Sequence, residues 1–143
     1  MIGWHVVGLF GPSFFTGSLI KRFGVLQVMT AGALLLYVVV AIAVSGISVA
    51  HFWYALVLLG VGWNFLYIGG TTLVAEACSP PERAKTQGAN DSIIFLTMMV
   101  TSFGSGVLID TPGWQTLNWL ALPFITVALG AVMLDFIYWG FSF

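Results

Sequence analysis

The chain has 143 residues, of which 59% are hydrophobic and only 6% are charged, and its net charge is −1. Its mean hydropathy of +1.04 leaves too few polar residues to coat a soluble domain of this size. The composition therefore predicts an integral membrane protein that is surrounded by a lipid bilayer and has no nucleic-acid partner.

Five apolar stretches follow one another along the chain. A bilayer core of about 30 Å needs roughly 20 apolar residues for each helical span. The strict alternation of a membrane β-barrel is absent from the sequence. The predicted fold class is therefore all-α, a polytopic transmembrane helix bundle forming a single membrane domain over 1–143, with spans at approximately 4–20, 26–44, 52–75, 88–109 and 117–138.

The basic residues indicate the orientation of these spans. Lys21, Arg22, Arg83 and Lys85 all fall in the loops 21–25 and 77–87, whereas the loops 45–51 and 110–115 have no Lys or Arg. Short loops that carry Lys and Arg stay on the cytoplasmic side. We therefore expect the N-terminus to lie outside and the C-terminus to lie in the cytoplasm.

Small residues and prolines suggest where the helices come close together or bend. Small residues at a helix surface allow two backbones to approach each other, and proline interrupts the helical hydrogen bonds. We expect close packing at three groups of small residues: Ser13 with Gly17, Ser102 with Gly106, and the cluster of Gly60, Gly62, Gly69 and Gly70. We expect kinks at Pro12 and Pro123.

The first basic loop contains a recognisable pattern. From residue 17 to residue 24 the sequence reads GSLIKRFG, and a tight turn between two helices requires glycine where the backbone dihedrals are unusual. This pattern resembles the loop signature G-x-L-x-D-R-x-G of the major facilitator superfamily, with matches at Gly17, Leu19, Arg22 and Gly24. Lys21 replaces the acidic residue, a departure that is typical of the weaker copy in the second half of such transporters.

The second basic loop supports the same resemblance. Ser79 and Glu82 form a potential capping box and Pro80 suits a first helical position, so we expect a helix to begin here. In the superfamily, a similar proline-acid-arginine loop joins helices ten and eleven, two spans after the first signature.

The resemblance implies a particular place within the transporter fold. It assigns the chain to helices eight to twelve, which makes it a partial superfamily fold and a fragment that lacks its seventh helix and N-terminal half. The alternative, helices two to six, would place an acidic residue where Lys21 stands, an arginine in the third span and a glycine-proline signature in the fourth. The sequence has none of these features.

Charged residues near the cytoplasmic ends of the spans are the first candidates for a functional site. A charge within a span is costly and therefore marks a functional position by default. Asp91, expected about 16 Å along the helix that begins near Pro80, is a candidate gate or proton-linked carboxylate. The resemblance implies a cytoplasmic charge cluster that acts as a gate, with the members Lys21, Arg22, Glu76, Glu82, Arg83 and Asp91. A purely structural ion pair of Asp91 with an arginine remains the alternative.

Neutral polar residues within the spans are candidates for the substrate path. Asn64, Asn90 and Asp91 are the principal ones, and ordinary hydrogen bonding between helices is the alternative explanation. The weaker candidates are the hydroxyls of Thr71, Thr72, Thr97 and Thr101, and an aromatic wall of Phe14, Phe15, Trp63, Phe65 and Tyr67.

The resemblance implies part of a secondary active transporter that moves a small molecule across the cell or cytoplasmic membrane by alternating access. An ion gradient would supply the energy, with protons as a candidate coupling ion, since the sequence has no nucleotide-binding loop. The alternative is a small membrane subunit or scaffold that transports nothing itself. No catalytic triad or metal-ligand spacing is present, so we expect no enzyme activity, no metal and no cofactor.

Overall fold

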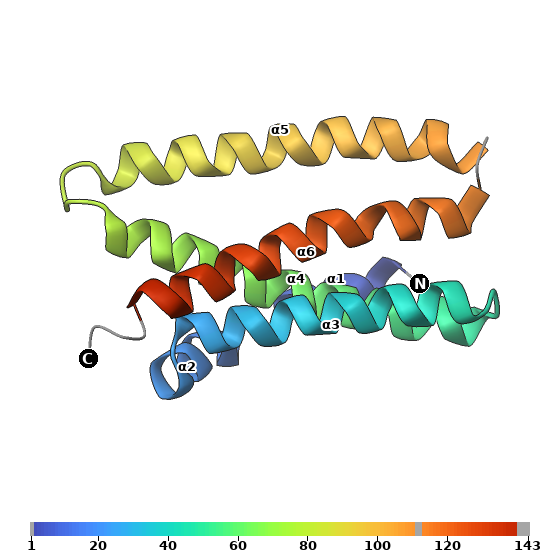
Figure 1. The fold of residues 1–143 in the computed structure, drawn as a ribbon, viewed down its shortest axis with the longest axis horizontal. Helices are drawn as coiled ribbons and strands as arrows, with labels where there is room; N and C mark the ends of the chain where they lie inside the picture. Colours follow the sequence, from blue (N-terminus) through green and yellow to red (C-terminus); the bar gives the residue numbers. More distant parts are fainter. Residues whose placement is uncertain (1, 111–112, 140–143) are drawn as a thin grey trace.

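The computed structural model describes residues 2–110 and 113–139, and the regular structure in these ranges is entirely α-helical (Figure 1). The all-α prediction is confirmed. The helices are α1 (Ile2–Phe10), α2 (Ser13–Phe23), α3 (Val25–Ser45), α4 (Val49–Ala77), α5 (Arg83–Asp110) and α6 (Gly113–Trp139). The predicted loop 110–115 lies partly outside the described residues.

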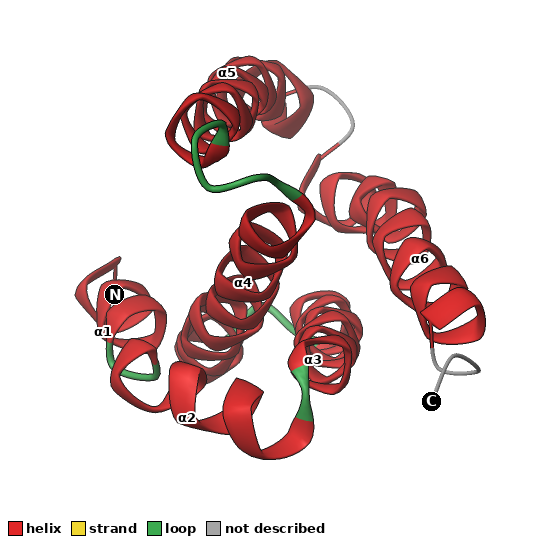
Figure 2. Cartoon of the chain, turned by 90° about the vertical axis from the view of Figure 1, so that its left-hand side faces the viewer, coloured by secondary structure: helices red, strands yellow, loops and turns green. Residues whose placement is uncertain are grey.

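Helix α4 lies at the centre of the bundle (Figure 2). It packs against α3 and α1, and it also contacts α2 and α5. Helix α6 packs along the other side of α3 and touches α5, and it reaches α4 through an edge-to-face contact of Trp114 with Phe52, whose ring centroids lie 4.9 Å apart. The core consequently lies between α3 and its two neighbours, where Val28, Ala33, Val40, Ala55 and Val132 are buried.

Glycines on α4 allow its close packing against both neighbours. A methyl group added to Gly60 would lie 2.6 Å from the carbonyl oxygen of His5 in α1, and one added to Gly62 would lie 3.1 Å from the carbonyl oxygen of Gly32 in α3. Gly69 accommodates the side chain of Met29 in the same way. Small residues on α4 therefore set its distance from α1 and α3, as the sequence suggested.

Three other candidate glycines make no close approach within the described chain. Gly17, Gly70 and Gly106 have no neighbouring atom within 4 Å of an added methyl group. Gly17 and Gly106 lie on α2 and α5, whose faces at these positions have no neighbouring helix within the described chain. A four-residue spacing of small residues permits close packing, but a partner helix still has to be present.

The first predicted span is interrupted. Helix α1 ends at Phe10 and α2 begins at Ser13, with Gly11 and Pro12 between them. Proline has no N–H to donate to the carbonyl four residues earlier, and its ring clashes with that carbonyl. The break therefore occurs at a kink position that the sequence indicated.

Within the described ranges, three helices are long and apolar enough to cross a membrane, namely α3, α4 and α6. Helix α5 has 28 residues and is therefore about 42 Å long, but its first turns are polar. Helices α1 and α2 are each too short to span a bilayer and together replace the first predicted span. Integral, multi-pass membrane insertion follows from the three apolar helices, whereas the membrane boundaries of the other two spans remain a prediction.

Helix α5 stands apart from the rest of the bundle (Figure 1). It contacts only α4 and α6 among the described helices. Its apolar side chains are exposed around its circumference, with Ile93 65%, Val100 65% and Phe103 76% accessible. A helix that is apolar on all sides is normally enclosed by lipid or by other helices.

Candidate functional site: an uncharged cavity beside a broken helix

The broken segment between α1 and α2 is bound to α4 by Asn64. The amide nitrogen of Asn64 donates to the carbonyl oxygen of Leu9 at 2.7 Å and to Oγ of Ser13 at 2.6 Å. Its amide oxygen accepts a hydrogen bond of 2.6 Å from Oγ1 of Thr16. Asn64 is only 4% exposed and Thr16 is fully buried. The amide thus compensates for helical hydrogen bonds that the break at Pro12 removes.

Asn64 was predicted as a candidate for the substrate path, and the structure places it in a different environment. All three of its hydrogen bonds go to residues of α1 and α2, and it does not line the cavity described next. This geometry corresponds to the alternative explanation, hydrogen bonding between helices.

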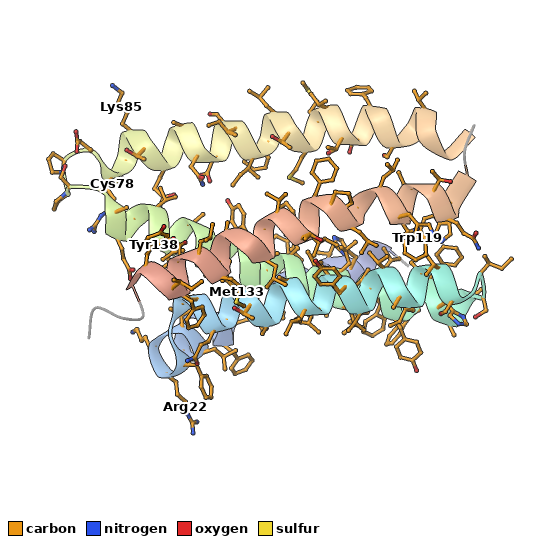
Figure 3. All side chains as sticks on the ribbon, in the orientation of Figure 1. Arg22, Cys78, Lys85, Trp119, Met133 and Tyr138 are labelled. Atoms are coloured by element: carbon orange, nitrogen blue, oxygen red, sulfur yellow. The ribbon has the colours of Figure 1, made fainter. Side chains whose placement is uncertain are left out.

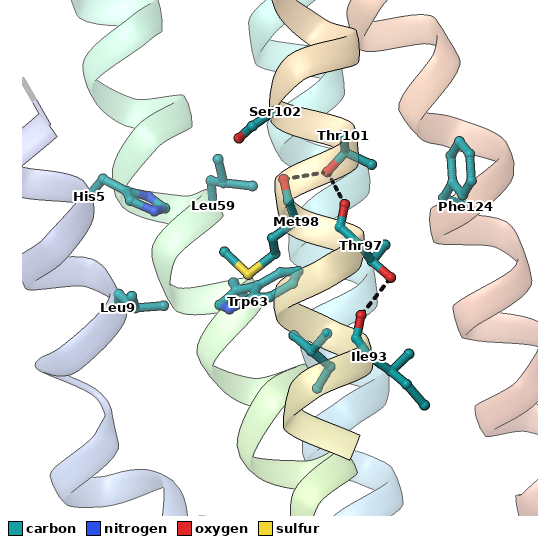
Figure 4. A pocket seen from close by; sticks show the side chains of 11 residues that line it. His5, Leu9, Leu59, Trp63, Ile93, Thr97, Met98, Thr101, Ser102 and Phe124 are labelled. Carbon is teal, nitrogen blue, oxygen red and sulfur yellow. Dashed lines mark hydrogen bonds between the residues drawn. The ribbon is translucent and has the colours of Figure 1, made fainter. Parts of the chain in front are cut away.

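A cavity of about 530 Å³ lies between α1, α4, α5 and α6 (Figure 4). Ligand-binding pockets typically have volumes of about 300–1,000 Å³ and mostly apolar walls. The cavity lining contains no Asp, Glu, Lys or Arg, and consists of His5, Leu9, Leu59, Trp63, Ile93, Ile94, Thr97, Met98, Thr101, Ser102 and Phe124. An ionic ligand would therefore have no charged partner in this wall, whereas a neutral ligand would lose little solvation on entering.

His5 has a defined orientation at the wall of the cavity. Its Nδ1 lies 3.0 Å from the carbonyl oxygen of Leu56 in α4. A carbonyl oxygen only accepts hydrogen bonds, so Nδ1 carries the hydrogen, and in the neutral imidazole Nε2 is then an acceptor. The ring extends from α1 towards the space beside Trp63 (Figure 4).

The hydroxyls of α5 contribute acceptors to the same wall. Thr97 donates to the carbonyl oxygen of Ile93 and Thr101 donates to that of Thr97, each at 2.8 Å. Because each hydroxyl uses its hydrogen within the helix, its oxygen keeps only accepting capacity for a ligand. Thr97, Thr101 and Trp63 are the weaker sequence candidates that the fold brings to this cavity.

The remaining weaker candidates lie elsewhere. Phe14 and Phe15 are 85% and 69% exposed on α2, and Phe65 lies beside a smaller hollow between α2, α3 and α4. Thr71 and Thr72 bond to carbonyls of their own helix. The predicted aromatic wall is therefore reduced to Trp63 in the cavity.

Asp91 and Gln87 connect α5 to α4 near the loop that joins these helices. The hydroxyl of Tyr67 donates to Oδ1 of Asp91 at 3.3 Å, and Nε2 of Gln87 donates to the carbonyl oxygen of Thr71 at 2.8 Å. Asp91 forms no ion pair with an arginine in the described chain, so the structural pair offered as its alternative is not formed here. Asn90 is half-buried beside Asp91 and does not reach the cavity.

The other members of the predicted charge cluster lie at one end of the bundle without pairing. Lys21 and Arg22 occupy the last turn of α2, Glu76 the last turn of α4, and Arg83 the first turn of α5. Arg22 and Lys85 both point outwards at this end (Figure 3). Arg22 lies 5.3 Å from the ring of Phe23, and no ion pair joins the cluster among the residues that the structure describes.

The first loop signature forms a helix end rather than an extended loop. Helix α2 continues through Lys21 and Arg22, where two positive charges favour the negative end of the helix dipole. Gly24 then adopts φ +94°, a conformation that strongly favours glycine, and its N–H donates to the carbonyl oxygen of Ile20 at 2.8 Å. Leu19 is half-buried and Gly17 is exposed.

The second loop differs from its prediction in where the helix begins. Helix α5 starts at Arg83 rather than at Pro80, and residues 80–82 form a turn in which Glu82 N–H donates to the Ser79 carbonyl at 3.0 Å. The Ser79 hydroxyl donates to the Glu82 carboxylate instead of forming a full capping box. Pro81 explains the delay, because a proline disfavours the helical conformation of the residue before it.

Sequence reasoning missed several cavity residues. His5, Leu59, Ile93, Met98, Ser102 and Phe124 come from four helices and share no local motif. The only signal in the sequence was the presence of a histidine within an apolar helix, where a titratable residue is unusual.

In a comparison with protein families, the sequence model of the Major Facilitator Superfamily matches residues 1–139 of this chain. A riboflavin transporter, RfnT, of Brucella anthropi is 47% identical over 93% of this chain and 33% of its own length. Two uncharacterised transporters of Bacillus subtilis also match. YdeG is 33% identical over 98% of this chain and 32% of its own length. YddS is 34% identical over 82% of this chain and 28% of its own length.

The chain thus spans about a third of the length of these relatives. No solved structure matches it. The family match over almost every residue, together with the all-helical bundle and its apolar spans, shows that the chain belongs to the major facilitator superfamily of membrane transporters.

Proposed function

We propose that this chain forms part of a secondary active transporter that carries a neutral, flavin-like molecule by alternating access. The observation that supports this proposal most directly is the open, uncharged cavity of about 530 Å³ that side chains of four helices line. The substrate class comes from the riboflavin transporter that is 47% identical over 93% of this chain. A neutral substrate agrees with a wall that has no charged side chain.

The complete transporter would include helices that are not part of this chain. The exposed apolar surface of α5 would pack against a seventh helix and an N-terminal half, as the resemblance to helices eight to twelve implies. In this arrangement the N-terminus of the chain lies outside, the C-terminus lies in the cytoplasm, and the charged end of the bundle faces the cytoplasm.

The charged end would act as a gate that stabilises one transport state. Lys21, Arg22 and Glu76 lie on α2 and α4, Glu82 lies in the turn before α5, and Arg83 is the first residue of α5. These groups are exposed and unpaired with one another in this conformation, so they remain available to charges on a neighbouring half. A gate of this kind works only if its contacts differ between the outward- and inward-facing states.

Asp91 is the candidate for coupling transport to protons. It lies between α4 and α5 and accepts a hydrogen bond from Tyr67, so a change in its charge would alter the contact between these helices. Protonation would remove the negative charge and change this contact in step with the transport cycle.

Uptake measurements test the proposal directly. Cells that require external riboflavin and express the complete transporter should take up labelled riboflavin, and a protonophore should reduce that uptake. Asp91→Asn should bind riboflavin with unchanged affinity but lose the stimulation of uptake by an inward proton gradient. Absence of uptake with normal membrane insertion would instead support a subunit or scaffold without transport activity.

A further inference from the structure

Two side chains from different helices present complementary groups to the cavity. Nδ1 of His5 is occupied by the carbonyl oxygen of Leu56, which leaves Nε2 as an acceptor. Trp63, on α4, contributes a flat indole surface and is 36% exposed. Both residues line the same cavity, and both are drawn towards its interior (Figure 4).

The rest of the wall suits an aromatic ring. Met98 offers a polarisable sulfur, which packs favourably against aromatic rings, and Phe124 offers a second aromatic surface from α6. The Thr97 and Thr101 oxygens can accept hydrogen bonds from ligand hydroxyls. The wall thus combines an aromatic platform, one directed nitrogen acceptor and additional hydroxyl oxygens, without a charge.

We propose that the cavity binds a neutral, planar heteroaromatic ring with an imide N–H, in which the ring stacks on Trp63 and the imide N–H donates to Nε2 of His5. This inference rests on the proposed transport function and adds the residues that select its substrate. Substrates without an imide N–H would leave the His5 acceptor unpaired in an apolar wall, which lowers their affinity.

Substitution of His5 can separate its two nitrogen atoms. His5→Asn retains an N–H close to the position of Nδ1, and therefore the donor to Leu56, but it lacks any group at the position of Nε2. His51→Asn is the matched control, because His51 bonds to Ser48 at the start of α4 and does not line the cavity. For the stacking contact, Trp63→Leu is compared with Trp119→Leu, whose parent side chain is exposed on α6.

The experiment measures equilibrium binding of riboflavin and of N3-methylriboflavin to the purified complete transporter. The wild type should bind riboflavin roughly five- to tenfold more tightly than the methylated analogue, because one hydrogen bond is lost. His5→Asn should weaken riboflavin binding by a similar factor and remove the preference, while Trp63→Leu should weaken both ligands about tenfold. The two control variants should behave like the wild type.

Different results overturn different claims. If riboflavin is transported but the wild type binds both flavins equally, or if His5→Asn keeps the preference, the assignment of His5 is wrong while the proposed function stands. If Trp63→Leu equals Trp119→Leu, the stacking contact is wrong. If the wild type neither binds nor transports riboflavin, the substrate class fails together with this site. The comparison of two ligands on each folded variant keeps the result independent of protein yield.

Discussion

Replacing Asn64 by leucine tests whether the break in the first span depends on its amide. Asn64 connects α4 to three positions around the break, the Leu9 carbonyl, the Ser13 hydroxyl and the Thr16 hydroxyl. Leucine has a similar size but supplies no hydrogen bond. The change therefore removes the polar contacts while it keeps most of the packing.

The remaining partners determine the expected loss of stability. Hydrogen bonds between membrane helices contribute about 0.6–2 kcal/mol each, so three of them set an upper limit of several kcal/mol. The Thr16 hydroxyl also lies 2.8 Å from the Pro12 carbonyl oxygen, to which it donates its hydrogen when Asn64 is replaced, so it stays satisfied without Asn64. The Leu9 carbonyl keeps only the Ser13 hydroxyl at 3.3 Å, which is a long contact. We expect Asn64→Leu to lower the free energy of unfolding by about 2 kcal/mol.

The assay is equilibrium unfolding of the complete transporter in mixed detergent micelles, followed by the loss of helical circular dichroism. Asn118→Leu is the matched control, because the Asn118 amide donates to the Trp114 carbonyl within its own helix, at 2.8 Å, and joins no second helix among the described residues. We expect the control to lose less than about 1 kcal/mol. Equal stability of the two variants would refute the role assigned to Asn64.

Two further substitutions test the packing and the gate. Gly60→Ala should lower the free energy of unfolding by about 1–3 kcal/mol in the same assay, because the added methyl group would lie 2.6 Å from a backbone oxygen of α1. Gly70→Ala is the control and should not lower it, because the space beside Gly70 is open. Equal effects of the two substitutions would contradict the close approach of α1 and α4. Arg22→Ala should shift the balance between outward- and inward-facing states, which is measured by the labelling of single cysteines. Lys85→Ala is the control and should leave this balance unchanged. If Arg22→Ala causes no shift, Arg22 is not part of the gate.

Much of the fold follows from local properties of the sequence. The apolar stretches predicted an all-helical chain, and Pro12 predicted a kink at the position where the structure interrupts the first span between α1 and α2. Gly24 was expected at an unusual backbone conformation and has φ +94°. These features depend on neighbouring residues only, which is why a single sequence reveals them.

The candidate site was much harder to predict. Asn64 could either have lined a substrate path or joined two helices, and its residue type is compatible with both. The choice depended on the carbonyl of Leu9, which the break exposes 55 positions away in the sequence. Likewise, nothing in the sequence paired His5 with Leu56, so its free acceptor nitrogen was not predictable.

The sequence by itself determined that this is an all-helical membrane protein of the major facilitator superfamily, because hydropathy, glycine turns and basic helix ends are local features. Only the tertiary structure decided which polar groups are occupied by other helices and which face the cavity. The physical reason is that a polar group in an apolar bundle takes the nearest partner in space, and that partner is set by how the helices cross.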